Sequence, residues 1–283
     1  MSYISDTIND LDIPTRILYN RSLAQLGVAA FRTGDYRGVL STLGDLYNRF
    51  QRLRELLGQG VGKDEDSSEA KRHVYPYHMF ISIDLLDSIH LISGAIVEVP
   101  HIAEFGPGSK RISSKFFRRR YLDYFHHHAR LNQNLSSIDS PRDAILVAAH
   151  NMSNGNWKVA WDLILDLKFW SSVHQSKIAQ QFLLDSIKIQ SLKCYLLTVC
   201  TAFNSIDLDV LINQFQLPES SIVKTVSNYA FNEVIHAAWS KNDRNKVCLM
   251  FAHHSTPTSH KVASQFLEKI QTINAITSSN RYK

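Results

Sequence analysis

Apolar residues recur three and four positions apart from Ile17 to about Phe203, which is the spacing of one buried face of an α-helix. Few residues interrupt this pattern, because the 283-residue chain has only 11 glycines and 7 prolines, about half their usual share. Strands need tight turns, and tight turns favour these two residues. The pattern therefore predicts a mostly α-helical protein, and it argues against an all-β fold or a glycine-rich nucleotide-binding fold.

Proline and glycine mark where the expected helices begin and end. Pro14 suits the first turn of a helix, because its missing N–H would have no partner there, and Gly34 ends that helix. Pro100 is expected to stop another helix before it. Residues 1–13 are expected to be flexible, and the charge-rich segment 61–75 to be a mobile loop. The helices predicted in this way cover residues 14–33, 36–57, 77–97, 109–131, 141–155, 157–169 and 175–203.

Two segments, 26–36 and 148–160, share one plan. In each, small residues allow two helices to approach, a glycine ends the first helix, and an aromatic residue begins the second. This plan resembles the inner half of a tetratricopeptide repeat. The spacing between the segments is not regular, so we expect a tetratricopeptide-like helical stack with irregular members.

The pattern changes after Phe203. Residues 205–209 can cap a short helix, and Pro218 precedes a second one. Two strand-like runs, 234–239 and 247–251, then flank a turn signal. This order predicts a winged helix, followed by an amphipathic helix over residues 258–276. The expected divisions are a helical repeat part over 14–172, a linking helix and winged helix over 173–254, and a C-terminal helix and tail over 255–283.

A helical repeat part followed by one winged helix resembles a PCI domain. Over about residues 17–276, the sequence is similar to the C-terminal half of the C-subunit family of eukaryotic translation initiation factor 3. The motifs are short and structural, and their shared order along the chain makes the resemblance specific. They are Ile17-Leu18-Tyr19-Asn20-Arg21, Gln25-Leu26-Gly27, Glu55-Leu56-Leu57-Gly58-Gln59-Gly60, Pro76-Tyr77-His78-Met79, Glu98-Val99-Pro100, Ile112-Ser113-Ser114-Lys115-Phe116, Pro141-Arg142-Asp143 and Gly155-Asn156-Trp157.

The resemblance implies a non-catalytic scaffold that assembles with other PCI subunits, chiefly the A and E subunits of the factor. It also implies docking on the small ribosomal subunit during translation initiation, in the cytoplasm. The family's long N-terminal half and its glycine-rich tail are expected to be missing, so the chain is either a fragment or a shortened subunit. Two alternatives are a PCI subunit of another assembly, of the proteasome lid or COP9 signalosome type, and an RNA-binding helical-repeat protein.

Catalytic and metal-binding patterns have little support. His126, His127 and His128 are adjacent on a predicted helix and point about 100° apart, so they cannot converge on one metal ion. Asp207 and Asp209 lie at a helix start, where carboxylates favour the helix dipole. We therefore expect no enzymatic activity, no cofactor and no metal.

Charge and composition restrict the partners further. The net charge is +5, yet the predicted winged helix over residues 204–254 carries four basic and five acidic residues, so DNA is not expected as a partner. Three cysteines at no metal spacing indicate a reducing compartment. The apolar stretch 91–97 is too short to cross a membrane, and the N-terminus has no signal-peptide pattern.

The strongest basic cluster lies in the helix predicted over residues 109–131, where aromatic residues follow the cations. It is either a solvated helix face or a surface that contacts the backbone of ribosomal RNA. The candidate RNA-contacting residues are Lys110, Arg111, Lys115, Arg118, Arg119 and Arg120.

The first strand of the predicted hairpin is expected to lie at the edge of its sheet. It has neither proline nor formal charge, so its unpaired backbone groups could pair with a strand from a neighbouring PCI protein. Alternatively, the chain's own helix over residues 258–276 covers this edge. The candidate subunit-interface residues are Val234, Ile235, His236, Ala237, Ala238 and Trp239.

Overall fold

The computed structural model describes residues 8–48, 53–60, 75–106, 108–109, 114–131, 140–241 and 247–251. Helices dominate these residues, and the strands form one three-stranded sheet, which confirms the mostly α fold class. The α-helices are α2 (Ile13–Arg32), α3 (Tyr36–Asn48), α4 (Leu53–Leu56), α6 (Ile83–Phe105), α7 (Lys115–Leu131), α8 (Pro141–Ser153), α9 (Trp157–Leu165), α10 (Ser176–Ala202), α11 (Leu208–Phe215) and α12 (Glu219–Phe231). The 3-10 helices are η1 (Ile8–Asp10), η3 (Tyr77–Met79) and η4 (Lys168–Ser172), and the strands are β1 (Ser205–Asp207), β2 (Ala237–Lys241) and β3 (Val247–Phe251).

The first helical hairpin, α2 and α3, forms as the sequence predicts. The side chain of Asp12 accepts a hydrogen bond from the Thr15 N–H, and a proline occupies the first turn of α2. Gly34 ends the helix with φ of 79°, a left-handed conformation that glycine adopts without strain. Between the two helices, a Cβ built on Gly27 would lie 2.7 Å from the Leu43 side chain, so only glycine permits this approach.

The second hairpin, α8 and α9, repeats the first turn in detail. Gly155 has φ of 80°, and the Asn156 N–H donates to the Asn151 carbonyl at 2.8 Å. In the first hairpin the corresponding bond runs from the Asp35 N–H to the Ala30 carbonyl at 3.0 Å. The shared plan seen in the sequence therefore corresponds to one turn geometry used twice.

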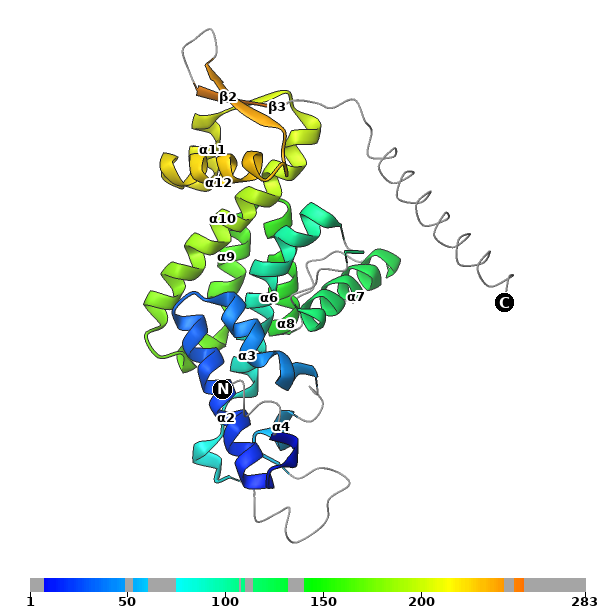
Figure 1. Cartoon of the computed structure of the whole chain (residues 1–283), viewed down its shortest axis with the longest axis vertical. Helices are drawn as coiled ribbons and strands as arrows, with labels where there is room; N and C mark the ends of the chain where they lie inside the picture. Colours follow the sequence, from blue (N-terminus) through cyan, green and yellow to red (C-terminus); the bar gives the residue numbers. More distant parts are fainter. Residues whose placement is uncertain are drawn as a thin grey trace, which may run out of the picture.

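The long helix α10 packs beside both hairpins (Figure 1). A Cβ on Gly34 would meet Phe182 of α10 at 3.3 Å, and a Cβ on Gly155 would meet Tyr195 of α10 at 3.0 Å. Phe182 and Tyr195 are thirteen residues apart, about 20 Å along a helix. Through these two contacts α10 spans the stack, and its end leads into the sheet at one end of the molecule.

Helix α6 differs from its prediction at both ends. It begins at Ile83, where Ser82 accepts a hydrogen bond from the Leu85 N–H, and it continues through Pro100 to Phe105. The prediction that the helix stops before Pro100 is wrong. Most of α6 is buried among α3, α8 and α10, and this packing sustains a helix in which proline removes one backbone hydrogen bond.

Several other bounds are shorter than predicted. Within the expected helix 36–57 the structure describes α3 and α4, and residues 49–52 between them lie outside the described part. Helix α7 begins at Lys115 rather than at residue 109, and α9 ends at Leu165, after which η4 follows. Residues 1–7, 61–74 and 252–283 also lie outside the described part, so the expected loop at 61–75 and the expected last helix at 258–276 stay predictions.

The C-terminal described region has the order α10, β1, α11, α12, β2, β3, with the strands arranged β1-β3-β2. This is the topology of a winged helix, and it lies at one end of the helical stack (Figure 1). Strand β1 is not predicted from the sequence, because three residues are too few for a recognisable alternation of apolar and polar positions. Its Ile206 pairs with Leu249 of β3, which is fully buried.

Candidate interaction surfaces

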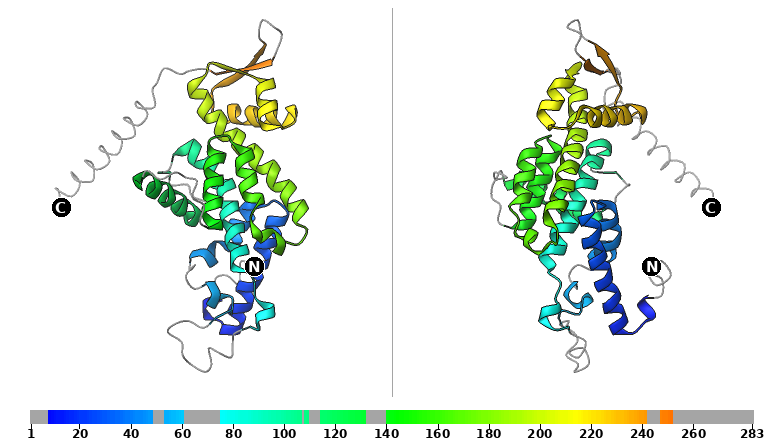
Figure 2. Two further views of the ribbon diagram at one scale, coloured as in Figure 1. Left: turned by 180° about the vertical axis from the view of Figure 1, so that it is seen from behind. Right: turned by 90° about the vertical axis from the view of Figure 1, so that its left-hand side faces the viewer.

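Helix α7, which carries the basic cluster, packs mainly on α6, on the side of the stack opposite α10 (Figures 1 and 2). A Cβ built on Gly94 of α6 would lie 2.6 Å from the Cβ of Phe117, so glycine permits the close approach. Phe117 is fully buried in this contact. The inner face of α7 is therefore fixed by packing, and the outer face is left to solvent.

Arg118 belongs to the inner face and not to the surface. Its guanidinium forms a salt bridge with Glu98 at 2.8 Å, and the two side chains are 5% and 1% exposed. It also donates to the Ser109 carbonyl at 2.8 Å, while the Ser114 N–H donates to Glu98 at 2.8 Å. The prediction that Arg118 contacts RNA is therefore wrong, because a buried side chain that is paired with Glu98 cannot reach a phosphate.

Three of the candidate RNA-contacting residues, Lys115, Arg119 and Arg120, are exposed on α7. Arg119 lies 3.7 Å from Asp123, and both side chains are largely in solvent, so this pair contributes little to stability. Lys110 and Arg111 lie outside the described residues. The basic surface that the structure supports is therefore smaller than the predicted cluster.

The histidine clusters give no metal site in the described part of the chain. His126 is exposed, and the side chains of His127 and His128 are outside the described set, as are His253 and His254. Among described residues, no three His, Cys, Asp or Glu side chains are grouped so that they could hold an ion. The cysteine Cys194 is buried, and burial raises the pKa of its thiol to about 12, which keeps the thiol protonated.

Strand β2 lies at an edge of the described sheet, as predicted, but it begins three residues later than expected. Ile235 is 2% exposed within the core, and the backbone N–H groups of Val234 and Ile235 both donate to the Tyr229 carbonyl. Val234 and Ile235 are therefore removed from the candidate edge. His236 is exposed and immediately precedes the strand.

The register of the sheet identifies the backbone groups that face outward from β2. The Phe251 N–H donates to the Asn204 carbonyl, so residue 251 directs its backbone groups toward β1. Because Ala237 is opposite Phe251, its N–H and carbonyl point away from β3. Ala238 is opposite Met250 and bonds inward, and the alternation makes Trp239 outward again.

Helix α6 is long and apolar. By length and composition, residues 77–105 contain a window that could cross a membrane, longer than the apolar run 91–97 considered in the sequence. In the structure 72% of that window is buried inside the protein, against α3, α8 and α10. Its apolar composition is therefore explained by its position as the central core helix of the stack.

Helical hairpins spanned by a long helix and followed by a winged helix define a helical-repeat fold of the PCI type. The sequence comparisons agree with this class. Residues 1–107 match the family model described as the N-terminus of eukaryotic translation initiation factor 3 subunit 8. The C subunit of eukaryotic translation initiation factor 3 from Danio rerio is 30% identical over 95% of this chain, the protein of that name from Caenorhabditis elegans is 29% identical over 96%, and that from Yarrowia lipolytica is 32% identical over 82%.

The chain belongs to the C-subunit family of eukaryotic translation initiation factor 3. It spans about 30% of the length of the curated relatives that it matches. The more specific prediction, that the resemblance lies in the C-terminal half of these relatives, stays a prediction, and the model matched by residues 1–107 is described as N-terminal.

Proposed function

We propose that this chain is a non-catalytic scaffold subunit of translation initiation factor 3, which assembles with other PCI subunits, chiefly the A and E subunits, in the cytoplasm. Its membership of the C-subunit family supports a role in translation initiation. The observation that carries the scaffold role is the outer edge of β2, whose Ala237 and Trp239 direct their backbone groups away from the described sheet.

The edge is suited to pairing with a strand from another subunit. Residues 237–240 contain no proline and no charge, and the charge of the strand is confined to Lys241 at its end. Natural proteins usually protect a free edge with charge, proline or a bulge, and such protection is sparse here. Backbone pairing along this edge would continue the sheet from one subunit into the next.

A proline substitution tests the edge. Ala237→Pro removes one outward N–H donor. An edge strand accommodates proline where the missing N–H faces outward, so we expect the variant to fold. We also expect it to lose co-assembly with the A and E subunits. Ala237→Ser keeps the N–H and should assemble normally. Ala238→Pro removes an inward donor and should instead disturb the β2–β3 pairing.

Co-purification and circular dichroism measure these outcomes. Normal assembly of a folded Ala237→Pro variant would exclude edge pairing at this residue. Recovery of proteasome-lid or signalosome subunits, or of RNA without stable protein partners, would instead support one of the two alternative functions.

We further propose that the outer face of α7 contacts ribosomal RNA when the complex binds the small ribosomal subunit. Lys115 and Arg119 support this proposal, because both are exposed on a helix whose inner face is anchored through Phe117 and Arg118. Exposed cations on a helix can neutralise nucleic-acid phosphates and release their condensed counterions.

The double variant Lys115→Glu, Arg119→Glu should weaken binding to the small ribosomal subunit and lower the slope of log K against log salt by roughly one to two. Lys224→Glu, on the exposed face of α12, is the control and should leave binding unchanged. An unchanged affinity and salt slope for the folded double variant would mean that this face is only solvated.

A further inference from the structure

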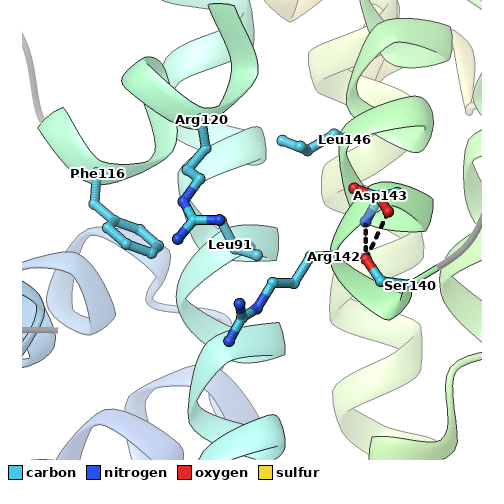
Figure 3. A pocket seen from close by; sticks show the side chains of 7 residues that line it. All are labelled: Leu91, Phe116, Arg120, Ser140, Arg142, Asp143 and Leu146. Atoms are coloured by element: carbon cyan, nitrogen blue, oxygen red, sulfur yellow. Dashed lines mark hydrogen bonds between the residues drawn. The ribbon is translucent and has the colours of Figure 1, made fainter. Parts of the chain in front are cut away.

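A pocket opens between α6, α7 and the N-terminal part of α8 (Figure 3). Two arginines from different helices, Arg120 and Arg142, direct their side chains toward it. The rest of the lining combines three apolar side chains with Ser140 and Asp143. The lining residues are Leu91, Phe116, Arg120, Ser140, Arg142, Asp143 and Leu146.

Arg142 is held in place by a buried carboxylate. Its Nε donates to Asp87 at 2.7 Å, its terminal nitrogen contacts the same oxygen, and Tyr47 donates to the other Asp87 oxygen at 2.8 Å. The Asp87 side chain is 4% exposed, whereas that of Arg142 is 40% exposed. The negative charge is therefore beneath the pocket, and the guanidinium forms part of its surface.

Arg120 approaches from α7. Its guanidinium carbon lies 5.3 Å from the centre of the Phe116 ring, a cation–π contact that holds the side chain along the pocket wall. Burial raises the pKa of Asp87, and the positive charges of Arg142 and Arg120 act against that rise. Both guanidinium groups therefore interact electrostatically with the Asp87 carboxylate.

The second carboxylate at the pocket, Asp143, is occupied locally. It accepts a hydrogen bond from the Ser140 hydroxyl at 2.7 Å, while the Ser140 oxygen accepts from the Asp143 N–H. This capping arrangement turns the carboxylate toward the start of α8. The donors that face the space between the helices therefore come from the two arginines, and the apolar contacts come from Leu91, Phe116 and Leu146.

We propose that this pocket binds a glutamate side chain of a partner protein, with apolar residues of the same segment against its wall. A carboxylate on an aliphatic stem matches both parts of the lining, because the guanidinium groups bind the oxygens and the apolar side chains cover the stem. An RNA phosphate is polar on every side and would leave the apolar wall unused. This inference is independent of the strand-edge proposal and of the contact between α7 and RNA.

Two short peptides test the pocket in the intact chain. The probe is acetyl-Leu-Glu-Leu-amide, and the matched control is acetyl-Leu-Gln-Leu-amide, titrated while the arginine Nε–H signals are followed by NMR. We expect saturable shifts at Arg120 and Arg142 with the glutamate peptide and about tenfold weaker binding of the glutamine peptide, the difference typical of a hydrogen bond to a charged group.

The variant Arg120→Gln should weaken the glutamate peptide about tenfold. Arg119→Gln removes the same charge from the neighbouring residue, which is not part of the pocket lining, and should leave binding unchanged. Arg142→Gln is avoided because it would leave the buried Asp87 without its ion pair.

Equal affinity for the two peptides, or equal effects of Arg120→Gln and Arg119→Gln, would overturn the proposal. Equal shifts from inorganic phosphate alone would also overturn it, since phosphate has no apolar stem. An RNA oligonucleotide that displaces the peptide and depends on Arg120 alone would assign the pocket to nucleic acid instead.

Discussion

His90 shows how a single polar residue depends on its surroundings. It is 2% exposed in the middle of α6, its ring stacks on Tyr47 with centroids 4.1 Å apart, and its Nδ1 has no hydrogen-bond partner within the described structure. Burial lowers its pKa from 6.5 to about 4. The neutral ring therefore acts as an aromatic core residue that fills the space between α3 and α6.

This burial predicts a pH dependence of stability. The unfolded chain binds a proton at His90 below about pH 6.5, and the folded chain does not until about pH 4. Its stabilising contribution is complete above pH 6.5 and is lost as the pH falls toward 4. Lowering the pH from 7 to 5 should thus reduce the free energy of unfolding by about 2 kcal/mol through this residue.

Chemical unfolding of His90→Phe at the two pH values measures this contribution. The variant should lose about 2 kcal/mol less than the wild type between pH 7 and 5. His126→Phe, at an exposed position on α7, should keep the wild-type dependence. The same dependence in wild type and His90→Phe would show that other groups are responsible.

At the scale of an element, α7 illustrates how a basic helix is attached to an apolar one. The ion pair between Glu98 of α6 and Arg118 of α7 is almost completely buried, and both partners make further hydrogen bonds. The pair fixes the register of α7 on α6 beside the contact of Phe117 with Gly94. Its main effect is on orientation, because desolvation offsets much of the attraction between buried charges.

Replacing only one residue of this ion pair should therefore lower the free energy of unfolding more than replacing both residues. Glu98→Gln leaves the Arg118 charge buried without its counterion, and we expect a loss of about 3–5 kcal/mol in the free energy of unfolding. The double variant Glu98→Leu, Arg118→Met should recover most of that loss. Urea unfolding of the three proteins measures this, and a double variant no more stable than Glu98→Gln would contradict the explanation.

At the scale of the whole molecule, contacts made by Trp157 and Lys188 join the helical stack to the winged helix. The Trp157 Nε1–H of α9 donates to the Gln214 carbonyl of α11 at 2.7 Å, and Lys188 of α10 lies 4.6 Å from the Trp157 ring centre. Lys188 also donates to the Gln216 carbonyl at 3.3 Å. Because buried apolar residues continue from α2 to β3 through this junction, we expect the described parts to unfold together.

Trp157→Phe retains the ring contact and removes the hydrogen bond to Gln214. The expected loss is about 1 kcal/mol, and the winged helix should gain mobility relative to the stack. Trp161→Phe, on the same helix and only partly buried, is the control. Thermal unfolding and backbone hydrogen exchange in α11 measure the effect, and unchanged exchange in α11 would contradict the coupling.

Part of the candidate sites could be read from the sequence, and part could not. The predicted edge strand is present, but the hydrogen bonds of Val234 and Ile235 to Tyr229 delay its start to Ala237. Arg118 is buried rather than exposed with the other cations; it lies three residues before the buried Tyr121, and that helical spacing was a usable signal. The pocket could not be predicted, because its residues come from three helices that only packing brings together.

The sequence by itself determined the mostly α class, the two glycine-ended hairpins, the long α10 and the final β-hairpin. These follow from local periodicity and local turn preference, which act between residues a few positions apart. Only the tertiary structure decided that α6 continues through Pro100, that Arg118 is buried and that β1 joins the sheet. In each of these cases a partner distant in sequence supplies the packing, the counterion or the hydrogen bonds, and that stabilisation outweighs the local preference.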